Sequence, residues 1–225
     1  MLAKDQRISD QFFSQARAYM VDGQVRPNNV TDQRLIAAMR LLPRERFLPP
    51  ECARQAYFDT DVRLPNGRVM LSPLTMARLV QFALPRPGER ALVVGAGTGY
   101  GAALVSACGA ETWALEEDEG LRAIAAQALA AHAPNVHLAA GRLIEGLPGQ
   151  APFDLILIEG CVVRLPTQFA RQLQVDGRLV TVLQERGLGR IVVAQPNTNG
   201  FAHRSMADSE APLLPAFEPE PGFVF

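Results

Sequence analysis

The chain has 225 residues, 48% of them hydrophobic, and its 22 lysine and arginine residues nearly balance 23 aspartate and glutamate residues, for a net charge of −1. This composition is typical of a folded globular protein, and the length suffices for one sizeable α/β domain with an N-terminal extension. The charge gives no bulk attraction to nucleic acid or to an anionic membrane, no apolar run is long enough to span a bilayer, and the first residues lack the apolar core of a secretory signal. We therefore expect no nucleic-acid partner and no membrane partner.

The cysteines and histidines are few and widely spaced. Cys52, Cys108 and Cys161 are odd in number, and neither they nor the three histidines have the spacing of a disulfide framework or a metal site. Each cysteine is more typical of a small buried hydrophobic residue than of a nucleophile. The pattern predicts a cytoplasmic protein without a bound metal.

The N-terminal part of the chain is predicted to be mainly helical. Apolar residues recur at helical spacing over residues 10–22. Thr31 is the expected N-cap of a second helix over residues 32–42. A third helix is expected from Ser72, as its cap, through Pro73 to Leu84, because proline is favoured at the first helical position.

From residue 89 onward, short apolar runs alternate with helical stretches, which predicts a mostly parallel sheet with both faces covered. The expected strands cover residues 91–94, 112–115, 136–139, 152–158, 178–183 and 190–194. The expected helices between them cover residues 100–107, 119–131 and 166–173. Only a short glycine-containing link separates the last two strands, which predicts a C-terminal antiparallel hairpin.

The predicted fold is therefore an α/β, Rossmann-like sheet preceded by an N-terminal helical extension. We expect residues 1–88 to form that extension, packed on the core, and residues 89–196 to form the α/β core. Residues 197–225 are rich in proline and are expected to be a loosely ordered tail. All three parts are expected to belong to one structural domain.

A glycine-rich turn dominates the centre of the chain, where residues 91–100 read ALVVGAGTGY. Gly95, Gly97 and Gly99 allow a positive φ or the close approach of a ligand, and the amides of the following helix start favour an anionic or polar ligand group. Tyr100 stands where the dinucleotide pattern G-x-G-x-x-G has its last glycine. About 20 positions on, a second apolar run ends in Glu116, whose carboxylate is placed to accept hydrogen bonds from ribose hydroxyls. Together these features favour S-adenosylmethionine over a nicotinamide cofactor, and a turn that only packs a helix on a strand is the alternative.

In a parallel sheet, ligands bind at the carboxyl ends of the strands. The order of the predicted strands brings the glycine turn, Glu116 and the residues after the third and fourth strands to one rim. The residues expected to bind the cofactor are Gly95, Ala96, Gly97, Gly99, Tyr100, Glu116, Gly141, Arg142 and Glu159. Arg142 has three possible roles on this rim: pairing with an acidic substrate, pairing with Glu159, or facing water.

Several stretches, in the same order along the chain, together resemble the protein-L-isoaspartate O-methyltransferase family. Residues 42–49 (LPRERFLP) resemble its VPREXFVP segment, 56–59 (AYFD) its AYXD, and 95–100 (GAGTGY) its GTGSGY. Residues 114–116 resemble the family's second-strand acid, and 152–154 (PFD) and 173–180 (LQVDGRLV) resemble PFD and QLKPGGRLV. The resemblance implies a class I methyltransferase fold, S-adenosylmethionine as cofactor, and esterification of the carboxylate of isoaspartyl residues in damaged proteins.

The chain departs from the family's pattern at four places. Leu71 occupies the position of the family's serine before the proline, and the hydroxyl moves to Ser72, which is either a helix cap or the catalytic hydroxyl. Val93 replaces an acid of the first strand, and Arg142 replaces the aspartate of the family's GDG. An arginine cannot accept the hydrogen bond that this aspartate takes from the adenine amino group. Glu159 begins the segment that replaces the family's TAA.

These departures keep a second function open, namely a divergent and weakly active or inactive relative that binds a different substrate or a protein partner. Methyl transfer to a carboxylate tolerates such losses well, because the acceptor is already ionised at neutral pH and the protein mainly aligns the reacting groups. An oxidoreductase and a nucleic-acid methyltransferase are less favoured, since Tyr100 disrupts the dinucleotide pattern and the chain has no basic patch with aromatic residues.

Overall fold

The computed structural model describes residues 2–218, with side chains from residue 10 onward. A seven-stranded sheet in the order β5-β4-β3-β6-β7-β8-β9 forms its centre. Its strands are β3 (Arg90–Val94), β4 (Glu111–Glu116), β5 (His137–Ala140), β6 (Phe153–Val162), β7 (Leu173–Glu185), β8 (Leu188–Asn197) and β9 (Gly200–Asp208). The pairs from β5 to β7 are parallel, and the pairs β7–β8 and β8–β9 are antiparallel. The Rossmann-like fold predicted from the sequence is thus confirmed.

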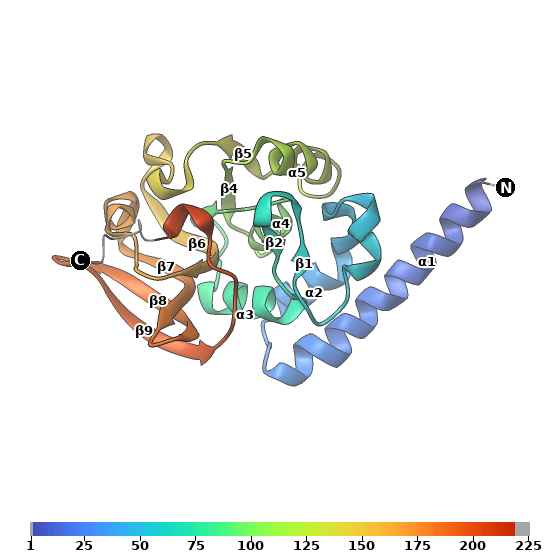
Figure 1. Ribbon diagram of the computed structural model, residues 1–225, viewed down its shortest axis with the longest axis horizontal. Helices are drawn as coiled ribbons and strands as arrows, with labels where there is room; N and C mark the ends of the chain where they lie inside the picture. The colour runs from blue at the N-terminus through green and yellow to red at the C-terminus, as the bar shows by residue number, and fades with distance from the viewer. Residues whose placement is uncertain (1, 219–225) are drawn as a thin grey trace, which may run out of the picture.

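Five α-helices accompany the sheet in the described part of the chain: α1 (Leu2–Met20), α2 (Gln33–Leu41), α3 (Pro73–Ala83), α4 (Tyr100–Ala107) and α5 (Glu119–His132). A small hairpin of β1 (Val62–Arg63) and β2 (Val69–Met70) precedes α3. Figure 1 shows α1 projecting away from the rest of the molecule, while β8 and β9 lie at the opposite end. None of the helices between residues 2 and 218 is both long and apolar enough to cross a membrane.

Residues 91–94 of the central strand β3 are buried on both faces, which explains their uninterrupted apolar sequence. Ala91 and Val93 face one cluster of buried residues, which the helices α2 to α5 share with the sheet. Leu92 and Val94 face a second cluster, which includes Phe169 and two residues near the C-terminus, Leu214 and Phe217. Short 3-10 turns, rather than long helices, supply the cover of this second face.

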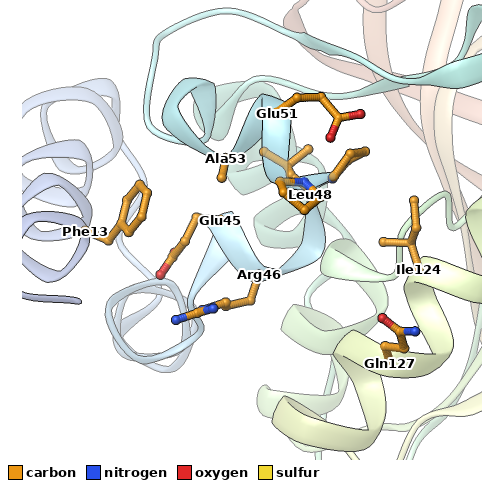
Figure 2. A pocket seen from close by; sticks show the side chains of 10 residues that line it. Phe13, Glu45, Arg46, Leu48, Glu51, Ala53, Ile124 and Gln127 are labelled. Carbon is orange, nitrogen blue, oxygen red and sulfur yellow. The ribbon is translucent and has the colours of Figure 1, made fainter. Parts of the chain in front are cut away.

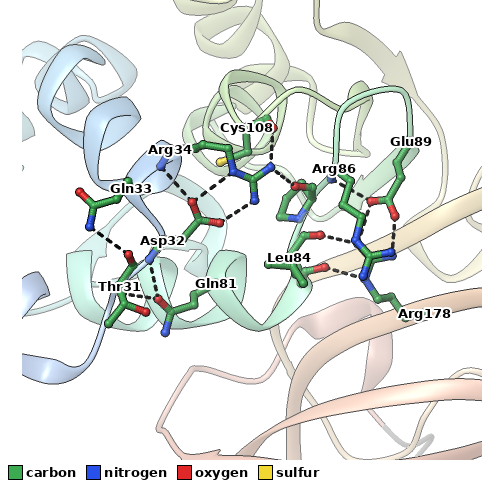
Figure 3. Close-up of polar contacts among 12 residues, drawn as sticks. Thr31, Asp32, Gln33, Arg34, Gln81, Leu84, Arg86, Glu89, Cys108 and Arg178 are labelled. Atoms are coloured by element: carbon green, nitrogen blue, oxygen red, sulfur yellow. Dashed lines mark hydrogen bonds and ion pairs between the residues drawn. The ribbon is translucent and has the colours of Figure 1, made fainter.

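The start of α2 differs from the prediction, because Asp32 and not Thr31 is its N-cap. The Asp32 carboxylate accepts hydrogen bonds from the Arg34 backbone N–H at 2.9 Å and from the Arg34 guanidinium at 2.6 and 3.2 Å (Figure 3). The backbone N–H of Thr31 instead donates to the Gln81 side chain at 2.6 Å. A charged cap with a second arginine contact outcompetes a threonine hydroxyl, because charge-assisted hydrogen bonds are stronger than neutral ones.

An ion pair ties the end of α3 to the sheet. Arg178 on β7 contacts both carboxylate oxygens of Glu89, at 2.8 and 3.0 Å, and donates to the carbonyls of Ala83 and Leu84 at 2.6 and 2.7 Å (Figure 3). Leu84 ends the helix in the left-handed conformation at φ +47°. These contacts therefore fix the connection between α3 and β3.

The prediction of a loosely ordered tail after residue 197 is wrong for most of its described part. Residues 200–208 form β9, which pairs along β8 after a turn in which the Asn199 N–H donates to the Asn197 side chain at 2.9 Å. Gly200 has a φ of +112°, a conformation that favours glycine. Farther on, Pro215–Phe217 form a 3-10 turn whose Phe217 side chain is buried.

Candidate functional site

Three strand ends meet at one rim of the sheet, as the sequence predicts. Val94 of β3 pairs with Leu115 of β4 on one side and with Ile158 of β6 on the other. The residues that follow, Gly95, Glu116 and Glu159, therefore stand next to one another. In open parallel sheets, ligands bind where the strand order reverses, and β3 holds that position here.

The glycine turn has the backbone that the sequence predicts. Gly95, Gly97 and Gly99 have φ values of +72°, +56° and +94°. The amides of Gly95 and Ala96 donate to the Leu115 carbonyl at 3.0 and 3.1 Å, which fixes the turn against β4. Gly99 also packs closely on α5, since a Cβ there would lie 3.1 Å from the Leu129 side chain.

Glu116 is the best-connected acid of the rim and is completely buried. Its carboxylate accepts hydrogen bonds from the Gly97 amide at 2.7 Å and from the Asp118 amide at 3.0 Å. It also forms a two-pronged pair with the Arg68 guanidinium, at 2.8 and 3.0 Å. A buried carboxylate is tolerated only when it is paired and hydrogen-bonded, and Glu116 meets both conditions.

Arg68 is a site residue that the sequence analysis missed. It follows the turn Pro65–Gly67 and reaches from the β1–β2 hairpin to the glycine turn, where its Nη2 also donates to the Gly95 carbonyl at 3.0 Å. Only 8% of Arg68 is exposed. An arginine next to a turn gives no signal of such a pairing, because its partner Glu116 lies 48 residues away in the chain.

The C-terminal segment 212–215 covers the same place, which was also missed. The Cys161 N–H donates to the Pro212 carbonyl at 2.9 Å, and the Leu214 N–H donates to the Cys161 carbonyl at 3.0 Å. The Leu214 side chain lies against Gly95 and Gly160: a Cβ at Gly95 would be 3.3 Å from it, and a Cβ at Gly160 only 2.5 Å. The apolar pair Leu213-Leu214 in a proline-rich stretch was the available sign of a buried anchor.

Little space remains between the β1–β2 hairpin, the end of β6 and the segment 212–215. The cavity there has a volume of about 10 Å³ and is lined by residues from three separate segments, among them Arg68, Leu71, Glu159, Gly160 and Leu214. Pockets for small ligands usually have a volume of about 300–1,000 Å³. In this conformation the chain's own side chains fill the part of the rim between Arg68, Glu159 and Leu214.

Glu159 stands where β6 bulges. Between Leu157 and Cys161, β6 has two more residues than β7 has between the matching Val180 and Val182. The Glu159 Oε1 atom is sealed from solvent and has no hydrogen-bond partner among the described residues. Burial raises the pKa of the Glu159 carboxyl to about 8, the Arg68 charge opposes this rise, and the Glu116 charge adds to it.

Tyr100 and Arg44 lie on the inner side of the turn, in the core. The Tyr100 ring packs edge-on against Phe47, with 5.5 Å between the ring centroids, and the Arg44 guanidinium lies 4.9 Å from the Tyr100 ring centroid. Arg44 is fully buried and donates to the carbonyls of Ala56 and Leu71 at 2.7 and 2.5 Å. Burial raises the pKa of Tyr100 to about 12. The Tyr100 side chain thus supports the turn from below rather than facing the rim.

Ser72 is the N-cap of α3. Its hydroxyl accepts a hydrogen bond from the Thr75 N–H at 3.3 Å, and its own N–H donates to Asp61 at 2.7 Å. Burial raises the pKa of the Asp61 carboxyl. The neighbouring Leu71, and not Ser72, lines the small cavity on the rim.

Arg142 faces water, which was one of its three predicted roles. Its side chain is 73% exposed and pairs with Glu145 at 2.9 Å, so the alternative pairing with Glu159 is wrong. Gly141 before it lies at the end of β5, where a Cβ would be 3.3 Å from Leu115. The amide after Arg142, that of Leu143, donates to Glu117 at 3.1 Å.

A second hollow lies away from this rim. A groove of about 520 Å³ runs between α1, the segment 45–53 and α5, and Figure 2 shows Phe13, Glu45 and Ile124 around it. None of the residues that line it belongs to the glycine turn or to the strand ends. The groove is therefore separate from the candidate site.

The strand order, the glycine turn and the acid at the end of β4 define a class I methyltransferase fold. Residues 16–210 match the family model described as protein-L-isoaspartate(D-aspartate) O-methyltransferase. The chain belongs to this family.

Similar proteins cover most of the chain. A protein-L-isoaspartate O-methyltransferase of Koribacter versatilis is 36% identical over 204 residues, which are 90% of this chain and 92% of that protein. One from Methylorubrum populi is 38% identical over 165 residues, 73% of this chain and 78% of that protein. Among solved structures, a Plasmodium falciparum protein named for the same activity, in complex with S-adenosyl-L-homocysteine, has a TM-score of 0.73 at 18% identity and covers 91% of this chain and 98% of that one.

Proposed function

We propose that this protein is an S-adenosylmethionine-dependent carboxyl methyltransferase that acts on L-isoaspartyl residues of damaged proteins. The family match over residues 16–210 supports this activity over the alternative of an inactive partner-binding relative. The observation that carries the proposal is the hydrogen bond between the buried Glu116 carboxylate and the Gly97 amide at 2.7 Å. It sets an acid and a glycine turn side by side at the rim where a nucleoside binds.

The residues of the rim fit the cofactor in part. Glu116 offers two oxygens to ribose hydroxyls, and the glycine turn lets a ligand approach its backbone. Arg68 and Leu214 stand in front of these groups, so the cofactor fits only after both have moved. When bound, S-adenosylmethionine supplies an electrophilic methyl group on a positively charged sulfur.

The chain's own residues have a simple task in such a reaction. An isoaspartyl carboxylate is ionised at neutral pH and needs no general base. The protein's contribution is therefore alignment, and the use of Ser72 as a helix cap leaves the chemistry possible. Losing one positioning hydroxyl, as at Leu71, would cost about 1–3 kcal/mol, or roughly ten- to a hundred-fold in rate.

A cytoplasmic location is part of the proposal. Its support is that Cys52, Cys108 and Cys161 are all free thiols in the structure.

Transfer of a labelled methyl group to an isoaspartyl peptide tests the activity. We expect a base-labile ester on this peptide and none on the matched aspartyl peptide. Gly97→Arg should abolish the label, because it fills the turn beside Glu116. Gly88→Arg is the matched control, since Gly88 also has a positive φ, +83°, with open space around it. Label on neither peptide with the wild-type protein would contradict the proposal.

A further inference from the structure

We propose that Arg68 and residues 212–215 form a latch that holds the cofactor cleft closed, so that the cofactor binds only by displacing both. This inference rests on the proposed function and concerns the regulation of the same site. Its basis is that these two segments contact the rim directly and leave almost no open space between them. The cavity between these two segments has a volume of about 10 Å³, far below the roughly 300–1,000 Å³ of an ordinary ligand pocket.

The first half of the latch is the Arg68 guanidinium, which competes directly for the acid. Both Glu116 oxygens are engaged by Arg68, at 2.8 and 3.0 Å, and one of them also takes the Gly97 amide. Ribose hydroxyls would donate to the same oxygens. A two-pronged arginine–carboxylate pair is among the strong polar contacts of a protein interior, so Arg68 has to leave before a ribose can bind.

The second half of the latch is Leu214, which lies where a ligand would touch the backbone. Gly95 and Gly160 leave room for the Leu214 side chain, since a Cβ at Gly160 would be only 2.5 Å from the Leu214 Cγ. The Leu214 side chain is only 4% exposed. Farther along, Phe217 packs edge-on against Phe169, with 6.3 Å between the ring centroids. The Leu214 side chain is thus closely packed and buried.

The attachment of this segment is local, which allows it to open without unfolding the sheet. Its backbone is held by the hydrogen bonds with Cys161, while β6 keeps its ladder with β3 and β7 independently. Segments that are held by few backbone hydrogen bonds open at lower free energy than core strands do. The latch therefore sets an equilibrium between a closed state and an open, binding-competent state.

The closed state weakens cofactor binding because the apparent Kd is the intrinsic Kd divided by the fraction of protein in the open state. If the open state is populated at about 1–10%, the apparent Kd is about ten to a hundred times the intrinsic value. A cofactor present well above that apparent Kd opens the latch by mass action. The protein would then load its cofactor only when the cofactor is abundant.

Calorimetric titration with S-adenosyl-L-homocysteine compares latch variants with matched controls. Leu214→Ala and Arg68→Gln should each lower the Kd by about ten-fold or more relative to the wild type. The controls Leu188→Ala and Arg204→Gln change exposed residues of the same type on β8 and β9, and should leave the Kd within about two-fold. An unchanged Kd in both latch variants would overturn the latch.

Hydrogen exchange on the wild-type protein gives a test that needs no variant. Saturating S-adenosyl-L-homocysteine should speed exchange of the Leu214 and Cys161 amides, whose hydrogen bonds hold the latch, while slowing exchange at the glycine turn. Unchanged or slower exchange at both latch amides, together with tight binding, would overturn the latch and leave the proposed function standing. Absence of binding to the wild type and to both latch variants would instead overturn the proposed function, and the latch with it.

Discussion

Glu159 and Gly101 are complementary at the level of single atoms. An ideal Cβ on Gly101 would lie 2.0 Å from the Glu159 Oε1, so the glycine at the start of α4 is what makes room for the carboxyl. That oxygen is unpartnered within the described chain, and burial raises the pKa of the carboxyl to about 8. The space for the Glu159 carboxyl therefore depends on the absence of a side chain at residue 101.

Glu159→Gln should change how stability depends on pH. A carboxyl whose pKa rises from 4.5 in the unfolded chain to about 8 in the folded protein retains its proton on folding, so wild-type stability falls as pH rises between these values and levels off above 8. The variant lacks this loss, and its stability relative to wild type should grow by on the order of 2–4 kcal/mol from pH 5 to pH 8. Urea unfolding of the wild type and the variant at both pH values measures this difference in the free energy of unfolding. Glu210→Gln, at an exposed glutamate, is the control. A difference that is the same at both pH values would contradict the assignment.

Gly101→Ala should destabilise the protein although alanine is the better helix former. The new methyl group clashes with the Glu159 carboxyl, and we expect a loss of about 1–3 kcal/mol. In a Glu159→Ala background the same change should be neutral or stabilising, because only the ordinary helix preference of alanine remains. A double-mutant cycle followed by denaturant unfolding measures the coupling. Equal effects in both backgrounds would refute the clash.

At the scale of elements, the loops and caps of this fold are set by contacts between distant segments. Asp32 caps α2 while its neighbour Thr31 is held by Gln81 of α3. Arg178 of β7 fixes the end of α3, and the segment 212–215 closes on β6. The cap of α2, the end of α3 and the cover of β6 are thus set by partners that the local sequence does not reveal.

The cap of α2 can be tested by a pair of neighbouring substitutions. Asp32→Ala removes the acceptor of the Arg34 N–H and should cost about 1–2 kcal/mol of stability. Thr31→Ala leaves its backbone donor to Gln81 in place and should cost less than about 0.5 kcal/mol. Thermal or urea unfolding of the two variants compares them directly. A larger loss for Thr31→Ala would restore the cap expected from the sequence.

For the whole molecule, the sequence predicts the central sheet and its glycine turn but not the contacts that cover the rim. The strands around the glycine turn and the acid Glu116 follow from short-range patterns, because a parallel strand buried on both faces is continuously apolar. The pairing of Arg68 with Glu116 and the seating of Leu214 over Gly95 join segments far apart in the chain, and no local pattern encodes them. The strand β9 was missed because the proline-rich composition after residue 208 dominated the prediction.

The expectation that the N-terminal extension, the α/β core and the C-terminal segment belong to one structural domain remains a proposal. In its favour, one cluster of buried residues joins residues of the N-terminal segment, such as Leu35 and Phe47, with Val93 of the central strand. The described part of the C-terminal segment contributes Leu214 and Phe217 to the second cluster. The three parts behave as one packing unit in these contacts.

Titration of the protein with S-adenosyl-L-homocysteine tests whether the rim formed by the glycine turn and Glu116 is a cofactor site. We predict saturable binding at a single site, lost in Glu116→Ala and retained in Glu119→Ala, because Glu116 and not Glu119 bonds to the glycine turn. No binding up to millimolar concentration, either by the wild type or by the opened variant Leu214→Ala, would contradict the assignment of this rim as a cofactor site.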